Sequence, residues 1–312
     1  MATSVRIGTR GSKLALWQAN FVKSILTEKF PCQAIELVVI KTLGDKILDV
    51  PLAKVGGKGL FVKEIEQALL DCRVDVAVHS MKDMPGEIPS GLCIGAVPPR
   101  ENPTDVLIAK HGAKLVDLAA GSVIGTSSLR RAAQLRHLRP DLVIRPLRGN
   151  LDTRLRKLQG QDLDAVIVAA AGVKRLNFEQ HVTEYFDCTV MLPAVGQGAL
   201  CIEIRENDPL IGPMTAALDD PATRAVVAGE RAFLHRLQGS CQVPIAGHGH
   251  LDDRGYTLHG LVADVDGSTV VRDSLSDAGE DCAHIGVQLA ETLLAKGADK
   301  ILARLKLMET QQ

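Results

Sequence analysis

The stretch Ser122-Val-Ile-Gly-Thr-Ser-Ser-Leu-Arg-Arg131 passes from a short apolar strand, through a turn of hydroxyl residues, into a helix that we expect to end near Leu138. The same plan recurs twice further along, with strands expected at 142–145 and 164–168 and a helical segment after each. Strands that alternate with helices are typical of βαβ units. This part of the chain therefore predicts an α/β lobe built on a parallel sheet.

Polar side chains follow each of these strands. The arginines are, in order, Arg130 and Arg131, then Arg148 with Arg154, then Arg175. Taken singly, each is better interpreted as a solvated surface charge. Because parallel strands present their carboxyl ends at one edge of a sheet, we expect the arginines to converge on one crevice. The hydroxyls of Thr126, Ser127 and Ser128, at a helix N-terminus, add a corner suited to a carboxylate or a phosphate.

Positive charge is concentrated in this region. Between residues 121 and 160, nine Arg and Lys stand against two Asp, a net charge of +7, whereas the whole chain of 312 residues has a net charge of −1. A basic block of this kind implies an anionic partner. Aromatic residues are only 3% of the chain and the block holds none that could stack on bases. A small polyanion is therefore favoured over nucleic acid.

The N-terminal segment has a similar strand, turn and helix. A strand expected at 4–7 leads through a glycine-flanked turn into a helix expected at 13–29. Arg10 and Ser12 lie in the turn, where the backbone N–H groups of the helix attract anions. An ordinary helix cap with a surface arginine fits these two residues equally well.

A third candidate position follows a strand expected at 74–79. Lys82 and Asp83 come directly after it, at the sheet edge where ligands bind in open α/β proteins. Asp83 is therefore a candidate catalytic residue. The structural alternative is an Asp that caps the turn before Pro85.

The connection 42–59 carries four glycines, Pro51 and lysines that include Lys54 and Lys58, without an evident element. A connection of this length is often a functional lid, which is the interpretation we prefer. The glycines are only a weak indication of a phosphate-binding loop, because Leu60 follows where such a loop has Lys and a hydroxyl residue.

Two Pro- or Gly-rich crossings, at 98–103 and 192–199, divide the chain. A strand expected at 200–205 follows the second crossing and could return to the first sheet. We therefore expect two hinged α/β lobes with a cleft between them and a smaller C-terminal α+β domain. The expected domains are, in order, 1–98 with 199–216, then 104–192, then 221–312.

The C-terminal domain displays a cysteine. In Gly239-Ser-Cys-Gln-Val-Pro244, a helix expected at 221–237 ends before Cys241 and Pro244 prevents helix continuation. A thiol on such a loop, with arginines in the preceding helix, suits a reactive thiolate. A small buried hydrophobic residue is the alternative. Strands are expected at 243–247, 256–263 and 269–274, and a helix at 280–294 should close the domain.

His248 and His250 share one strand face, and with Cys241 they faintly suggest a metal site. No third or fourth ligand has an obvious spacing, so two exposed histidines are the preferred interpretation, and we expect no metal.

Composition places the protein in a reducing compartment. The seven cysteines are an odd number without CxxC pairs, which argues against a disulfide framework. No apolar run reaches the length of a membrane span, and no signal peptide is visible at the N-terminus. We expect a soluble cytoplasmic protein.

Many motifs in one order resemble the porphobilinogen deaminase family over nearly the full chain. The segments that carry the resemblance are Gly8-Thr-Arg-Gly-Ser12, Pro51-Leu-Ala-Lys-Val-Gly-Gly-Lys-Gly-Leu-Phe61, His79-Ser-Met-Lys-Asp-Met-Pro85, Gly125-Thr-Ser-Ser-Leu-Arg-Arg131, Leu147-Arg-Gly-Asn150, Leu192-Pro-Ala-Val-Gly-Gln-Gly-Ala199, Glu230-Arg231 and Gly239-Ser-Cys-Gln-Val-Pro244. Ser240 is a small residue where many relatives have Gly.

The resemblance implies two lobes like those of type II periplasmic binding proteins and a third domain that bears the cysteine. It implies a dipyrromethane cofactor bound covalently through a thioether at Cys241. The implied reaction joins four porphobilinogen molecules head to tail with loss of ammonia, and water then releases hydroxymethylbilane. A monomer is expected.

The resemblance also assigns roles to residues. Asp83 would be catalytic, holding pyrrole N–H groups and stabilising the cation formed when ammonia leaves. The expected cofactor contacts are Cys241, Lys82, Asp83, Thr126, Ser127, Ser128, Arg130, Arg131, Arg148 and Gly172. The expected substrate contacts are Arg10, Ser12, Arg148, Arg154, Arg175 and Gln197. Arginine suits this site because each pyrrole bears acetate and propionate groups.

Two rival functions come from other classes. A non-catalytic two-lobed receptor for a small anion would leave the Cys241 loop without a purpose. A cysteine-nucleophile acyl transferase would need an acid to orient a histidine base near Cys241, and none is evident in the sequence. Formation of a coloured product from porphobilinogen would discriminate against both.

Overall fold

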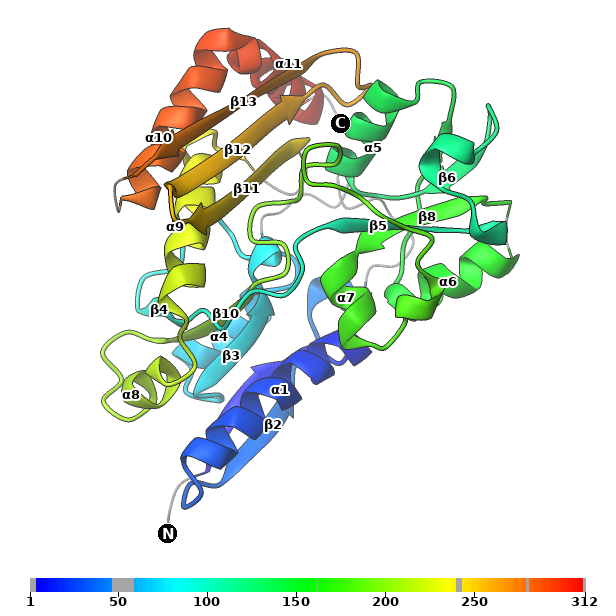
Figure 1. Ribbon diagram of the computed structural model, residues 1–312. Helices are drawn as coiled ribbons and strands as arrows, with labels where there is room; N and C mark the ends of the chain where they lie inside the picture. Colours follow the sequence, from blue (N-terminus) through cyan, green and yellow to red (C-terminus); the bar gives the residue numbers. More distant parts are fainter. Residues whose placement is uncertain (1–3, 47–58, 161, 240–242, 279–280, 311–312) are drawn as a thin grey trace.

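The computed structural model describes residues 4–46, 59–160, 162–239, 243–278 and 281–310 (Figure 1). The strands in these ranges form three sheets, with the orders β2-β1-β3-β10-β4, β7-β6-β8-β5-β9 and β11-β12-β13. The predicted fold class, two α/β lobes and a smaller α+β domain, is confirmed. None of the helices in these ranges has the length and apolar character needed to cross a membrane.

The first lobe surrounds the sheet that contains the N-terminal strand. Its elements are β1 (Val5–Thr9), α1 (Lys13–Lys29), β2 (Ile35–Val39), α2 (Leu43–Lys46), α4 (Lys63–Leu70), β3 (Val76–Ser80), η1 (Met81–Asp83), β4 (Leu92–Ala96), β10 (Leu200–Arg205) and α8 (Ile211–Ala216). β1 runs parallel to β2 and β3, whereas β10 pairs antiparallel with β3 and β4. The prediction that the strand after the second crossing returns to the first sheet is therefore confirmed.

The second lobe contains the three predicted strand-to-helix turns. Its elements are β5 (Asp105–Ala109), η2 (Lys110–Gly112), η3 (Leu115–Asp117), β6 (Val123–Gly125), α5 (Leu129–Leu138), β7 (Val143–Arg145), α6 (Leu151–Gly160), β8 (Ala165–Ala169), α7 (Ala170–Arg175), η4 (Glu179–His181) and β9 (Glu184–Tyr185). β6 runs parallel to β7 and β8, as predicted.

The prediction of a purely parallel sheet in the second lobe is wrong, because β5 was not anticipated and runs antiparallel to β8 and β9. All five residues of β5 are buried. A strand buried on both faces shows no apolar alternation, and it begins directly after the proline-rich crossing, so its pattern is indistinct.

In the third domain, helices and the sheet share one apolar core, with the helices on one face of the sheet (Figure 1). Its elements are α9 (Pro221–Arg236), β11 (Ile245–Asp252), β12 (Gly255–Ala263), β13 (Val270–Asp277), α10 (Cys282–Leu293), η5 (Leu294–Ala298) and α11 (Asp299–Thr310). The prediction that α10 closes the domain is wrong. Gly297 interrupts the helix with φ of 104°, and α11 then resumes.

Polar caps set the helix starts that face the cleft. The Ser12 hydroxyl accepts a hydrogen bond from the backbone N–H of Ala15, and Ser128 accepts one from Arg131. At α9, Asp220 caps the helix and Pro221 occupies its first turn. These local signals explain why the predicted helix starts lie close to the observed ones.

The two crossings and the third domain meet at the buried carboxylate of Glu230. It accepts hydrogen bonds from Arg100, at 2.6 Å and 3.2 Å, and from the backbone N–H groups of Gly196 and Gly249. Gly198, at φ 89°, lies so near the other crossing that an added Cβ would sit 2.2 Å from the Glu101 carbonyl oxygen. The lobes are thus joined at a compact junction.

Candidate active site

A cavity opens at the carboxyl ends of β1 and β3, where Asp83 lies in the single turn η1. Arg10, Phe61, His79 and Asp83 are among the residues that line it. Arg10 is 2.5 Å from the Asp45 carboxylate, and its guanidinium carbon lies 4.1 Å from the centre of the Phe61 ring. The structure therefore brings Arg10 and Asp83 together, as the sequence predicted, although Arg10 already has a carboxylate partner.

A second cavity lies between the lobes. Ser80 and Lys82 of the first lobe line it together with Gly172 and Arg175 of the second. The backbone carbonyl of Gly198 accepts a hydrogen bond from Arg175, at 2.8 Å, so the second crossing also borders this space. Residues predicted from both lobes thus face one another across the cleft.

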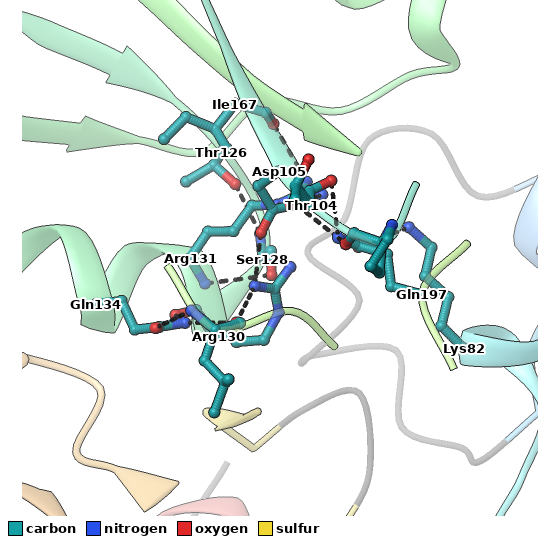
Figure 2. Close-up of polar contacts among 12 residues, drawn as sticks. Lys82, Thr104, Asp105, Thr126, Ser128, Arg130, Arg131, Gln134, Ile167 and Gln197 are labelled. Atoms are coloured by element: carbon teal, nitrogen blue, oxygen red, sulfur yellow. Dashed lines mark hydrogen bonds and ion pairs between the residues drawn. The ribbon is translucent and has the colours of Figure 1, made fainter. Parts of the chain in front are cut away.

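A polar chain crosses the cleft floor from one lobe to the other (Figure 2). Lys82 Nζ donates to the side-chain oxygen of Gln197 at 3.3 Å. The Gln197 amide nitrogen donates to Asp105 Oδ1, at 2.9 Å, and to the carbonyl of Pro103, at 2.8 Å. The amide of Gln197 thus lies between protein groups. Its expected contact with substrate stays a prediction.

Asp105 is the centre of the second lobe's charged cluster (Figure 2). Its carboxylate is fully buried and receives hydrogen bonds from Arg130, at 2.7 Å, and from Arg131, at 2.7 Å and 3.0 Å. Burial alone would raise the pKa of Asp105. The charges and hydrogen bonds of the two arginines outweigh that effect and hold its pKa well below the usual range.

The cations near Asp83 exceed the carboxylates that could neutralise them. Burial, and then the charge of Arg131, lower the pKa of Lys82 to about 8, while Asp83 opposes this shift. Burial, followed by Arg131, likewise lowers the pKa of Arg154 to about 10, with Asp83 opposing and Arg148 adding to it. Positive groups that depress one another's pKa form a site that carboxylates of a ligand would stabilise.

The hydroxyls at the start of α5 are occupied within the protein. Ser128 caps the helix, Ser127 donates to the carbonyl of Leu147 at 2.9 Å, and Thr126 accepts from the backbone N–H of Ser128 at 3.2 Å. They shape the turn, and any ligand contact would use their remaining hydrogen-bonding capacity.

Arg175 and Arg154 are each held by a backbone carbonyl. Arg154 donates to Gly149 at 2.9 Å. Arg175 lies 5.6 Å from the ring centre of Trp17, on α1 of the other lobe, and burial lowers its pKa to about 10. The α1–α7 contact, with the ion pair between Lys13 and Asp152, brings the second lobe's turns against the first lobe.

Some predicted positions lie outside the described residues, namely Ser240, Cys241 and most of the expected lid, with Lys54 and Lys58. The histidines proposed as a weak metal site, His248 and His250, lie on β11, and the centres of their stacked rings are 6.5 Å apart. The ring of His259, on β12, stacks on that of His250 with 5.9 Å between the ring centres. Across the described residues, no group of three or more His, Cys, Asp or Glu is arranged to hold a metal.

Sequence reasoning missed Asp105 and two glutamates of the first lobe. Asp105 is the first residue of an apolar run that follows a proline-rich crossing. An acid at the start of such a buried strand was the sequence feature that could have indicated a charged cluster. Glu66 and Glu203 are buried near His79, which entered the sequence analysis only as the first residue of the motif that contains Asp83. Their proximity depends on pairing between β3 and β10, which local sequence does not reveal.

Comparisons with known proteins agree over nearly the whole chain. Residues 5–212 match the family described as porphobilinogen deaminase, dipyromethane cofactor binding domain, and residues 224–295 match porphobilinogen deaminase, C-terminal domain. A porphobilinogen deaminase of Syntrophotalea carbinolica is 52% identical over 99% of this chain and 98% of its own length. The porphobilinogen deaminase of Geobacter metallireducens is 54% identical over 96% of this chain and 94% of its own length.

Solved structures also resemble the chain. One is a periplasmic binding protein of Salmonella typhimurium with high arginine specificity, which is 15% identical, has a TM-score of 0.42, and matches 72% of this chain and 96% of its own.

Proposed function

The chain belongs to the porphobilinogen deaminase family, and from this premise we propose that Asp83 is its catalytic residue. The enzyme is a transferase that joins four porphobilinogen molecules head to tail on a covalent dipyrromethane primer, releasing ammonia and giving hydroxymethylbilane. The observation that carries the proposal is the position of Asp83, whose carboxylate lines the cavity at the end of β3 and acts electrostatically on Lys82 and Arg154.

Loss of ammonia leaves the substrate as a cationic methylene-pyrrole. The Asp83 carboxylate can accept the pyrrole N–H hydrogen bond and stabilise that positive charge within a partly enclosed cavity. It can also take up the proton that a pyrrole carbon loses when each carbon–carbon bond forms. One carboxylate thus serves the electrostatic and the proton-transfer parts of the reaction.

The residues of the cleft fit the dipyrromethane group, because its carboxylates match an excess of partly desolvated cations. When bound, this group supplies the pyrrole carbon to which the first substrate molecule is joined. We propose Cys241 as its covalent attachment point. The side chains proposed to hold it are Lys82, Asp83, Thr126, Ser127, Ser128, Arg130, Arg131 and Arg148, with Gly172 beside them.

Substrate carboxylates would use further cations of the cleft. We propose Arg10, Arg148, Arg154 and Arg175 for this role. We propose that Ser12, which caps α1, and Gln197, whose amide bridges Lys82 and Asp105, also contact the substrate. The partly exposed pairing of Arg10 with Asp45 can exchange for a substrate carboxylate at modest cost, because both side chains keep some contact with solvent.

Three further proposals concern the whole protein. We propose domain boundaries at 1–98 with 199–216, 104–192 and 221–312, in keeping with the three sheets. We propose that the enzyme is a monomer, which light scattering during size-exclusion chromatography would test. We propose a cytoplasmic location, as the unpaired pattern of cysteines in the sequence favours, which cell fractionation would test.

The intact mass of the purified protein tests the attachment. The protein should exceed its sequence mass by two linked porphobilinogen-derived units, and Cys241→Ser should lack this adduct. The matched control is Cys32→Ser, which alters an exposed cysteine and should retain the adduct. If Cys241→Ser still carries the adduct, the attachment residue is wrong. If the wild-type protein shows the bare mass even after incubation with hydroxymethylbilane, the covalent primer is wrong.

A further inference from the structure

Beneath the cavity that contains Asp83 lies a buried group of three ionisable side chains from three elements of the first lobe. His79 is on β3, Glu203 on β10 and Glu66 on α4, and each residue is at most 6% exposed. His79 Nε2 lies 3.0 Å from Glu203 Oε2. Neither their burial nor their clustering is required for packing the lobe, since apolar residues would fill the same space without desolvating charge.

Each glutamate retains an oxygen that makes no hydrogen bond within the described residues. These atoms are Oε1 of Glu66 and Oε1 of Glu203, both buried. Burial, and then the charge of Glu203, raise the pKa of Glu66 to about 7. At neutral pH a proton is therefore available to the carboxylate pair, which relieves the repulsion between two buried acids.

Other charged and titratable groups face this cluster from the surrounding elements. Lys63 on α4 acts on Glu66, and the groups that act on or respond to Glu203 are Cys93, Cys201 and Arg231. Arg231 donates to the carbonyls of Pro85 and Gly86, just after the Asp83 turn. Within the described residues, neither Lys63 nor Arg231 forms an ion pair with Glu66 or Glu203, and His79 is the hydrogen-bond partner of Glu203.

The cluster reaches the catalytic cavity through His79. The residues that line this cavity include both His79, which lies in β3, and Asp83, which lies in the η1 turn directly after β3. When Glu203 is ionised it can only accept a hydrogen bond, so His79 carries its hydrogen on Nε2 and keeps Nδ1 as an acceptor. A carboxylate that orients a histidine in this way makes it an effective proton acceptor.

We propose that His79, oriented by Glu203 and backed by Glu66, is a proton relay that restores Asp83 to its ionised form after each condensation. The inference rests on the catalytic role proposed for Asp83. Asp83 contacts the reacting atoms, whereas His79, Glu203 and Glu66 act through it as positioning and relay residues.

The proton released in one cycle can be followed from the pyrrole carbon to the solvent. The substrate's C–N bond breaks and ammonia leaves with the electron pair of that bond. A pyrrole carbon attacks the resulting cation, a carbon–carbon bond forms, and the attacking carbon loses its proton to the Asp83 carboxylate. The proton then passes to His79, whose positive charge Glu203 neutralises, and returns through the cavity to water or to the departing ammonia.

Two variants test the relay while preserving its shape. His79→Gln keeps a hydrogen-bond donor for Glu203 but cannot accept a proton, and Glu203→Gln removes the charge that orients His79. We expect each to lower kcat by about tenfold or more with little change in KM. The double variant should be no slower than the slower single variant, because the two residues act as one unit. The pH profile of kcat and its solvent deuterium isotope effect should change with them.

The matched control is the pair of His235 and Glu87, which has the same chemistry on the surface, with side chains 58% and 86% exposed. His235→Gln and Glu87→Gln should leave kcat, its pH profile and the isotope effect unchanged. The proposal is overturned if the buried variants carry the primer and retain kcat and pH profile within about twofold of wild type. It is also overturned if both buried variants fail to fold or to hold the primer, since the cluster would then be structural.

An independent measurement does not rely on turnover. Infrared spectra of the wild-type protein should show a buried protonated carboxyl band that disappears as the pH rises through about 7 and is absent from Glu66→Gln. Lack of this band would overturn the role of Glu66. Asp83→Asn separates the two hypotheses: normal turnover by this variant refutes the catalytic role of Asp83, whereas normal turnover by His79→Gln refutes the relay alone.

Discussion

The two lobes present the same architecture to the cleft but opposite chemistry. In the first lobe, β3 ends at Asp83, and acids lie buried beneath it beside His79. In the second lobe, the parallel strands end at arginines, and the buried acid Asp105 lies among them. On the proposed assignment, the first lobe supplies the acid that stabilises a cation and moves a proton, with Arg10 and Lys82 beside it, and the second lobe supplies most of the cations that bind anions.

The two lobes also differ in how their buried carboxylates are stabilised. Asp105 neutralises part of the charge on two arginines and holds their planes in place, so the anion site is organised before a ligand arrives. Among the described residues, Glu203 beneath Asp83 pairs with His79 and with no arginine, and the raised pKa of Glu66 favours a protonated carboxyl that would relieve the repulsion. Two lobes of similar fold can therefore stabilise buried carboxylates in different ways, by ion pairs with arginines in one lobe and by protonation in the other.

The largest expected effect is that of Asp83→Asn. The amide keeps the size of the side chain but loses the negative charge and the proton acceptor. We expect kcat to fall by roughly 10²- to 10⁴-fold while the fold and the primer are retained, which steady-state kinetics and intact mass would check. A kcat near that of the wild type would refute the division of roles between the lobes.

Arg131→Leu should mainly affect anion binding. Removing this guanidinium leaves Asp105 with fewer donors and the primer with fewer cations, so we expect incomplete primer loading or arrest of chain growth. Mass spectrometry of the protein after incubation with porphobilinogen would count the units attached. Arg156→Leu, at an exposed arginine of α6, is the matched control and should load and elongate normally.

Asp105→Asn should loosen the second lobe. Without this carboxylate, two buried arginines repel each other, and breaking a buried ion pair costs about 3–5 kcal/mol of unfolding free energy. Chemical denaturation would measure it. Asp141→Asn, which affects the exposed pair with Arg139, should leave the denaturation midpoint essentially unchanged. Equal stability of the two variants would show that Asp105 does not organise the arginines.

Glu66→Gln should alter how stability depends on pH. The folded-state pKa of Glu66 is raised from 4.5 to about 7, so its favourable contribution is present below pH 4.5 and is lost as the pH rises through 7. The variant does not titrate at this position. The free energy of unfolding of Glu66→Gln, relative to that of the wild type, should therefore increase by up to roughly 3 kcal/mol as the pH rises from 4.5 to 7. A pH-independent difference in melting curves would contradict protonation of Glu66.

Much of the site was predictable because its local patterns are strong. Asp83 after a buried strand and the arginines after β6, β7 and β8 follow from strand-to-helix turns and from the common direction of parallel strands. Gln197 shows the limit of this reasoning. Its motif places it at a crossing, but only the folded chain shows that its amide bridges Lys82 and Asp105.

The sequence by itself determined the class of the fold, the alternation of helices and strands, the family and the residues around the cleft, because these depend on periodicity, caps and ordered motifs within short segments. Only the tertiary structure decided that Asp105 pairs with Arg130 and Arg131, that Glu203 bonds His79, and that Glu66 lies near enough to interact with both. Those contacts join residues far apart in the chain through antiparallel pairing of β5 with β8 and of β10 with β3. Register between distant strands depends on packing of the whole lobe, which no single segment encodes.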